Sequence, residues 1–182
     1  MFICRTMLSY NWIQLSSVAV IIPNHPRPRY LRYILSAAYA TGAINMDETI
    51  PGDALIIGLG GGSANNYLRH ATKNINVTVV EIDPTSVDLA KTYFGFNEDE
   101  RQRCVEEDGA IYIRKCAKRG QKFDLIISDT SQENNTYVQA PSDSFLKLSV
   151  VRYFPEILKK TGVLIMNCLT SKILSVEKVS DF

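Results

Sequence analysis

Four short stretches at regular intervals carry residue types that could bind a nucleotide-like ligand. Glycines stand at positions 58, 60 and 62, and acids stand at positions 81, 108 and 129. Each stretch ends or directly follows an apolar run, and neighbouring stretches are about one strand-and-helix unit apart. In an open sheet of parallel strands, ligands bind at the edge where the carboxyl ends of the strands meet. The spacing therefore predicts one ligand site built from four successive strand ends.

The glycine-rich turn follows the apolar run 54–57. Gly58, Gly60 and Gly62 lack a Cβ atom, so the backbone can adopt positive φ and approach a ligand closely. A helix that starts here would present its unpaired amides and the positive end of its dipole to the same ligand. A plain tight turn is the alternative interpretation, but the position between a strand and a helix favours a binding site.

The acid at position 81 closes the second apolar run, residues 76–82. The Glu81 carboxylate could accept hydrogen bonds from both ribose hydroxyls of a nucleoside, and charge-assisted bonds of this type are strong. The alternative role is a helix N-cap, which suits Asp83 better because Asp83 stands directly before Pro84. We therefore expect Glu81 at the ligand and Asp83 at the start of a helix.

Two further acids follow the third and fourth apolar runs. Asp108, which precedes Gly109 and Ala110, could accept from an adenine exocyclic amine, and capping of the next helix is a compatible second role. Asp129 ends the run 124–129, next to the strand of the glycine turn, where polar groups would face the reacting end of a cofactor. For Asp129 the alternative is an acid that caps a loop.

Hydrophobic periodicity predicts a regular alternation of strands and helices that would position these residues. Strands are expected at 54–57, 76–82, 103–106, 123–128 and 162–169, and helices at 30–43, 63–71, 84–94, 109–118 and 142–160, the last with a candidate break at Pro155. Continuous apolar strands in such an alternation indicate a parallel sheet covered by helices on both faces. The predicted fold class is α/β, with a Rossmann-like, doubly wound, mainly parallel sheet.

Residues 1–29 are expected to form an N-terminal strand or loop extension, and residues 30–182 one Rossmann-like domain. The sequence predicts no strand after 162–169, so the sheet is expected to end with this fifth strand. The fifth strand would then lie near an edge of the sheet, a position that proteins usually cover. Either a partner would cover it, or the chain is a C-terminally truncated version of a longer protein.

The overall composition excludes other classes of protein. With 182 residues, 46% of them hydrophobic, and a net charge of +1, the chain suits one globular domain and lacks the basic bias of a nucleic-acid-binding protein. The apolar stretch 12–22 is too short to span a bilayer, so no membrane segment is expected. Four cysteines without a CxxC pair and two histidines predict no metal site, and they suit reduced thiols in a cytoplasmic protein.

In their order along the chain, these motifs resemble those of class I S-adenosylmethionine-dependent methyltransferases, specifically the spermidine-synthase-like group. Segments 90–96 and 107–113 look most similar to the C-terminal domain of the elongation-factor-1-alpha lysine and N-terminal methyltransferases, and the resemblance covers roughly residues 30–169. It implies S-adenosylmethionine as the cofactor. The implied cofactor-binding residues are Gly58, Gly60, Gly62, Glu81, Ile82, Asp108, Gly109, Ala110 and Asp129.

Two departures separate the chain from the aminopropyltransferases that share this resemblance. Those enzymes carry an acid just after the motif glycines, where this chain has the segment 63–66, and a second aspartate after the fourth strand, where it has Gln132. Glutamine cannot act as a base, and the loop has lost a negative charge that would hold a polyamine. Methyl transfer to a protein amine, a lysine or an N-terminus, is therefore favoured. Asp129, Thr130 and Gln132 are weak candidates for orienting that acceptor.

Three alternatives stay open at this point. Gln132 disfavours an aminopropyltransferase, and Ser63 disfavours an NAD-type dehydrogenase, whose fingerprint asks for glycine or alanine there. The third alternative is a non-catalytic cofactor-binding or scaffold protein, which the early end of the predicted sheet favours. The helix 30–43, with Tyr33 and Tyr39, could supply part of an acceptor pocket or a homodimer face, but core packing is the favoured role.

Overall fold

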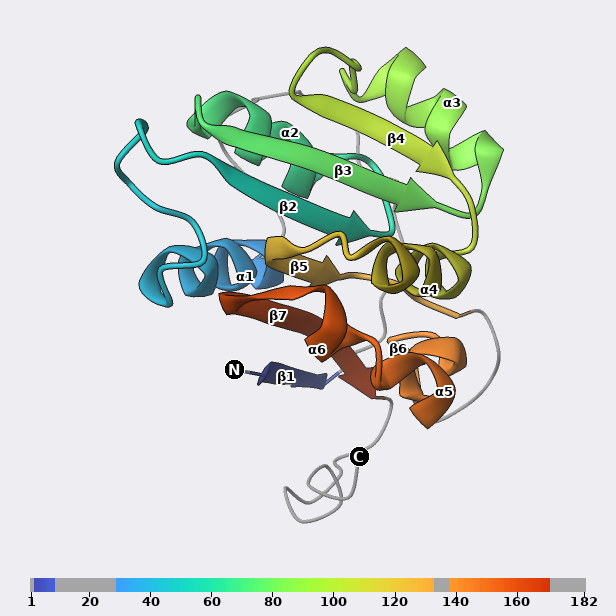
Figure 1. The fold of residues 1–182 in the computed structure, drawn as a ribbon. Helices are drawn as coiled ribbons and strands as arrows, with labels where there is room; N and C mark the ends of the chain where they lie inside the picture. The colour runs from blue at the N-terminus through green and yellow to red at the C-terminus, as the bar shows by residue number, and fades with distance from the viewer. Residues whose placement is uncertain (1, 9–28, 133–137, 171–182) are drawn as a thin grey trace.

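A single mixed sheet with helices on both faces organises the chain in the computed structural model, which describes residues 2–8, 29–132 and 138–170 (Figure 1). The strand order across the sheet is β1-β7-β5-β2-β3-β4, and β6 pairs with β7 outside this series. All pairs are parallel except the antiparallel pair of β6 and β7. The strands are β1 (Phe2–Leu8), β2 (Gly52–Ile57), β3 (Ile75–Glu81), β4 (Gln102–Glu106), β5 (Phe123–Ser128), β6 (Val138–Ala140) and β7 (Leu158–Thr170).

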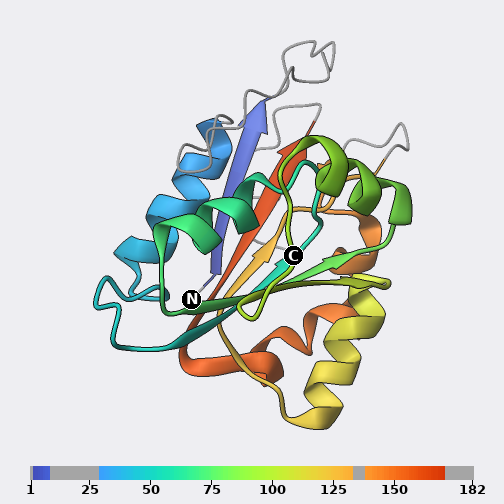
Figure 2. The ribbon, with the colours of Figure 1, turned by 90° about the horizontal axis from the view of Figure 1, so that it is seen from above.

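The helices lie on the two faces of this sheet, as Figure 2 shows from above. Their bounds are α1 (Arg29–Ala40), α2 (Ser63–Ala71), α3 (Pro84–Tyr93), α4 (Gly109–Arg119), the 3₁₀-helix η1 (Asp143–Leu146), α5 (Leu148–Val151) and α6 (Phe154–Ile157). The first three contribute buried residues to one core cluster, and α4 to α6 contribute to the other. This two-sided cover confirms the predicted α/β class with a Rossmann-like, mainly parallel sheet.

Alternation along the central strand β2 divides the core between the two faces. Ala54 and Ile56 pack with the cluster under α1 and α2, whereas Leu55 and Ile57 pack with the cluster under α4. Successive side chains of a strand point to opposite faces, so a strand buried on both faces must be apolar throughout. The continuous apolar runs in the sequence have this cause.

The predicted helix 142–160 is wrong in its continuity and its end. The segment instead contains η1, α5 and α6, and β7 already begins at Leu158. Lys147 and Leu158 adopt extended backbone conformations, with ψ of 132° and 139°, which no helix can pass through. Phe145, Val150 and Phe154 are buried at near-helical spacing in the cluster that includes α4, so the segment resembles one helix although it is broken. The break expected at Pro155 lies just before it, because α5 ends at Val151 and α6 begins at Phe154.

The predicted fifth strand, 162–169, lies one strand from an edge of the sheet, as expected, and no strand follows it among the described residues; what the sequence did not predict is that β1 of the same chain covers it. The fifth strand forms most of β7, which lies between β5 and the N-terminal strand β1. The β1 strand runs parallel to β7, with Phe2 opposite Leu164 and Leu8 opposite Thr170. The described sheet therefore contains β6 in addition to the five predicted strands, and β1 lies within the segment 1–29, where a strand or loop was expected. The remainder of the 1–29 extension, like residues 171–182, lies outside the described residues.

Candidate functional site at the carboxyl edge of the sheet

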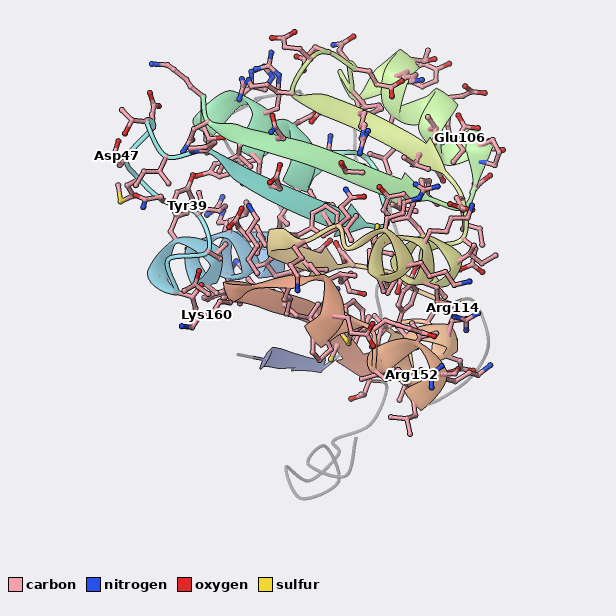
Figure 3. All side chains as sticks on the ribbon, in the orientation of Figure 1. Tyr39, Asp47, Glu106, Arg114, Arg152 and Lys160 are labelled. Carbon is pink, nitrogen blue, oxygen red and sulfur yellow. The ribbon has the colours of Figure 1, made fainter. Side chains whose placement is uncertain are left out.

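The carboxyl ends of β2, β3, β4 and β5 meet at one edge of the sheet, toward which their arrowheads point in Figure 1. The four stretches singled out in the sequence all follow these strands. Charged side chains of both signs surround this side of the molecule, with Glu106, Arg114 and Arg152 labelled in Figure 3. The topology thus gathers the predicted site residues at the edge where open α/β sheets bind ligands.

The glycine turn connects β2 to α2 through three residues with positive φ. Gly58, Gly60 and Gly62 have φ of 94°, 51° and 70°. A Cβ atom on Gly58 would lie 2.4 Å from the Asp129 carbonyl oxygen, so only glycine allows the turn to pack against the end of β5. Gly62 is the N-cap of α2 and supplies no side-chain capping bond, which leaves amides of the first turn for a ligand.

Glu81 is buried, with 8% of its surface exposed, and its carboxylate joins two loops. Oε2 accepts from the backbone N–H of Leu59 at 2.7 Å, and Oε1 accepts from Ile82 and Asp83 at 2.8 and 3.0 Å. An ionised carboxylate offers about four acceptor positions, so about one remains, on Oε2. Glu81 therefore fixes the glycine turn to the end of β3 and keeps one acceptor position for a ligand hydroxyl.

The two residues after Glu81 have different roles. Ile82 is 68% exposed at the edge of the sheet, and it offers an apolar contact beside Glu81. Asp83 accepts from the Thr85 backbone N–H at 2.9 Å and thereby caps α3. That backbone bond, together with the Ser86 hydroxyl, lowers the pKa of Asp83. The capping role predicted for Asp83 is confirmed.

Asp108 caps α4 through one of its two carboxylate oxygens. Oδ1 accepts from the backbone N–H of Ala110 at 2.7 Å and, more weakly, from Ile111 at 3.4 Å. Gly109 is required for packing, because a Cβ atom there would lie 2.6 Å from the Ile57 side chain. The predicted capping role of Asp108 is therefore confirmed, while a ligand contact through Oδ2 stays a prediction.

Asp129 lies at the end of β5 between two donors that sequence motifs did not identify. The Tyr30 hydroxyl on α1 donates to Oδ2 at 2.9 Å, and the Asn167 amide on β7 donates to Oδ1 at 2.8 Å. Burial, and then the nearby Asp129 charge, raises the pKa of Tyr30 well above its ordinary value. A polar residue in the buried phase of β7 was the one available sequence signal for Asn167.

The other two candidates for orienting an acceptor belong to the loop after β5. The Gln132 amide donates to the Val138 carbonyl and to Asp143 Oδ1, both at 2.9 Å, while its oxygen accepts from the Asp143 backbone N–H at 2.9 Å. The Thr130 hydroxyl accepts from the Ser142 backbone N–H at 3.2 Å. In this conformation Gln132 holds the loop together, and an acceptor contact by either residue stays a prediction.

A separate hollow of about 270 Å³ lies at the opposite, amino edge of the sheet. It is lined at the starts of the strands by Asp53, Asn76, Thr78, Arg101, Arg103 and Gln121, among others. None of the predicted site residues contributes to it. Within the described residues no group of three or more histidine, cysteine or acidic side chains could hold a metal ion, and no helix is long and apolar enough to cross a membrane.

Comparison with known proteins places these features in context. The family model of the spermine/spermidine synthase domain matches residues 41–180. The eEF1A lysine and N-terminal methyltransferase homolog of Drosophila pseudoobscura is 30% identical over 148 residues, 77% of this chain and 22% of that protein. The polyamine aminopropyltransferase of Vibrio vulnificus is 31% identical over 131 residues, 71% of this chain and 42% of that protein.

Among solved structures, human methyltransferase-like protein 13 in complex with SAH has a TM-score of 0.68 and 27% sequence identity. The match covers 80% of this chain and 67% of that one. The chain therefore spans a minor part of the length of the first two relatives and about two thirds of the solved structure.

Proposed function

The chain belongs to the spermine/spermidine synthase domain family, and from that membership we propose that it is an S-adenosylmethionine-dependent methyltransferase acting on a protein amine. The relatives named as eEF1A lysine and N-terminal methyltransferases support a lysine or an N-terminus as the acceptor. The observation that carries the proposal is the convergence of the glycine turn, Glu81 and Asp129 at one edge of the sheet.

The residues at this edge fit the chemical groups of S-adenosylmethionine. The uncapped amides of α2 suit its carboxylate, and the remaining acceptor position of Glu81 suits a ribose hydroxyl. Ile82 offers apolar contact to the adenine ring, and Asp108 Oδ2 can accept from the adenine amine. Gly58, Gly60 and Gly62 let the backbone approach the cofactor, while the small residues Gly109 and Ala110 form the start of α4 next to Asp108.

When bound, this cofactor supplies a methyl group that its sulfonium already activates. The protein must therefore align a deprotonated acceptor amine and exclude competing orientations. Asp129 is the side chain best placed to accept an N–H bond from that amine, because its carboxylate is fixed by two neighbours. In such a transfer the acceptor nitrogen would gain the methyl group as the C–S bond breaks, and the amine proton would leave to solvent.

A second candidate function is aminopropyl transfer, which the similarity to the Vibrio vulnificus polyamine aminopropyltransferase favours. Against it stands Gln132, which cannot accept a proton and whose amide already bonds Val138 and Asp143. Position 132 thus lacks the second carboxylate expected of such an enzyme. We therefore place methyl transfer first.

Parallel ligand titrations separate the candidate functions. Urea unfolding is measured with S-adenosylmethionine, its decarboxylated analogue and NAD, since a ligand of the native state at 100 times its Kd adds about 2.7 kcal/mol. S-adenosylmethionine is expected to stabilise the chain most, and radiolabelled methyl transfer to purified eEF1A then tests the acceptor. A stabilising effect of the decarboxylated analogue alone would favour aminopropyl transfer, and binding without transfer would favour a scaffold role.

The proposal extends to partner and location. The acceptor named in the relatives is an elongation factor, which supports a protein substrate and a cytoplasmic location. Tyr33 on α1 is 56% exposed and could contribute to a homodimer face. Light scattering of the purified chain tests the dimer, and fluorescent tagging of the expressed chain tests the location.

A further inference from the structure

We propose that Asn167 is a positioning residue for the acceptor side of the site and acts through the Asp129 carboxylate. The inference rests on the proposed function. The Asn167 amide donates to Asp129 Oδ1 at 2.8 Å, and both residues are half-buried. They come from neighbouring strands, 38 positions apart in sequence. No ligand role proposed above involves Asn167 directly.

The phase of β7 shows that this asparagine is not an ordinary strand residue. Val163 and Ile165 are buried in the core on the α1 face, and strand alternation places Asn167 in the same phase. Met166 pairs with Ser128 in the register of β5 and β7. Asn167 and Asp129 are the next residues of the two chain segments, so they lie side by side. Asn167 thus carries an amide at a position where the preceding residues of the same phase are apolar, and this amide donates to the Asp129 carboxylate.

Asn167 completes a two-sided hold on Asp129. Tyr30 donates to Oδ2 and Asn167 to Oδ1, and each carboxylate oxygen keeps about one acceptor position. With both oxygens held, the remaining acceptor positions keep one orientation relative to the glycine turn, against which the Asp129 backbone packs. Loss of the Asn167 bond would free the carboxylate to rotate, and misplacement of an orienting group lowers rate more than affinity.

The first test compares Asn167→Ala with a matched control. We expect kcat for methyl transfer to purified eEF1A to fall about tenfold, as for loss of a hydrogen bond to a charged group. The Kd for S-adenosylhomocysteine should stay unchanged, since the Asn167 amide bonds Asp129, which the proposal places on the acceptor side of the site. Cys168→Ala, whose side chain projects to the other face of β7, should keep the wild-type kcat. An unchanged kcat in Asn167→Ala overturns the inference.

The second test is a double-mutant cycle in the rate of transfer. If Asn167 acts through Asp129, Asn167→Ala lowers the rate of the wild type but not that of Asp129→Ala. Equal losses in the two backgrounds overturn the inference, and so does an undiminished rate in Asp129→Ala alone. Urea unfolding checks that each variant folds. Asn167→Leu, which has a similar size but no donor and adds no charge, replaces Asn167→Ala in the cycle if the alanine variant does not fold.

Different results would overturn the proposed function and the role of Asn167. A wild-type chain that binds S-adenosylhomocysteine but transfers no methyl group to eEF1A overturns the proposed function, and the inference falls with it. A wild-type chain that is active, but whose Asn167 and Asp129 losses add independently, overturns the inference alone.

Discussion

Replacement of Glu81 by glutamine should destabilise the fold even without a ligand. A glutamine side chain has the same shape as glutamate but only one acceptor oxygen. If that oxygen takes the place of Oε1, the new NH₂ group faces the Leu59 N–H; if it takes the place of Oε2, the NH₂ group faces the N–H groups of Ile82 and Asp83. Either orientation sets donors against donors, so no rotation restores the loop contacts.

The expected magnitude follows from which amide loses its partner. The bond from the Leu59 N–H is buried, so the loss leaves a buried donor without an acceptor, at a cost of about 1–3 kcal/mol. The bonds from Ile82 and Asp83 are only partly buried, and water can replace the carboxylate there at small cost. The glutamine oxygen should therefore face the Leu59 N–H and leave the cheaper, partly buried bonds unmade, so we expect the free energy of unfolding to fall by about 1 kcal/mol.

Urea unfolding followed by circular dichroism measures this loss, with the slope of the transition as a check that the unfolded state is unchanged. Glu106→Gln is the matched control, because Glu106 pairs with Glu81 in register but lies exposed on β4 (Figure 3). The control should stay within about 0.5 kcal/mol of the wild type. A Glu81→Gln variant as stable as this control would refute the reasoning that Glu81 joins the two loops.

Three further substitutions test other parts of the structure. Gly58→Ala should lower the free energy of unfolding by about 2 kcal/mol or more, because the new Cβ would meet the Asp129 carbonyl. Gly120→Ala is the control in urea unfolding: Gly120 has φ of 66° but open space around it, so the change should cost only about 1 kcal/mol. The raised pKa of Tyr30 means that the phenol ionises first in the unfolded chain, so stability should fall as pH rises above about 10. Tyr30→Phe should flatten this fall in urea midpoints measured from about pH 9 to 11. If the variant and the wild type lose stability with the same slope, Tyr30 is not the group responsible. Lys159→Met, which breaks partly exposed ion pairs to two aspartates, should cost about 0.5 kcal/mol, and a loss that persists in 1 M salt (~3 Å screening length) would contradict a surface-pair origin.

The glycine turn and the strand ends show how far local pattern carries. Predicted strand and helix bounds from residue 53 to residue 128 agree with the structure to within about two residues. In this region each element has its own apolar period and its own start or stop signal, such as Asp83 before Pro84 and Gly120 after α4. Local chemistry therefore located the glycine turn, Glu81, Asp108 and Asp129 at strand ends.

The segment after β5 shows why the same method failed there. Hydrophobic periodicity predicted one helix over 142–160, but the burial of Phe145, Val150 and Phe154 in one cluster does not require a continuous helix. The sequence suggested Gln132 as a candidate for orienting an acceptor, whereas in the structure its amide donates to Val138 and Asp143 within the loop. Which partner an exposed amide meets depends on the path of the loop, which no local period encodes.

The sequence by itself determined the fold class, the edge of the sheet at which we propose a ligand site, and the acids that lie at that edge. Only the tertiary structure decided that β1 pairs with β7 and that Tyr30 and Asn167 donate hydrogen bonds to Asp129. It also decided that the Glu81 carboxylate accepts mainly from backbone amides. The physical reason is separation along the chain. Parallel pairing joins segments that are far apart in sequence, and Tyr30 lies 99 positions from Asp129, so register and packing had to be formed before these contacts could exist.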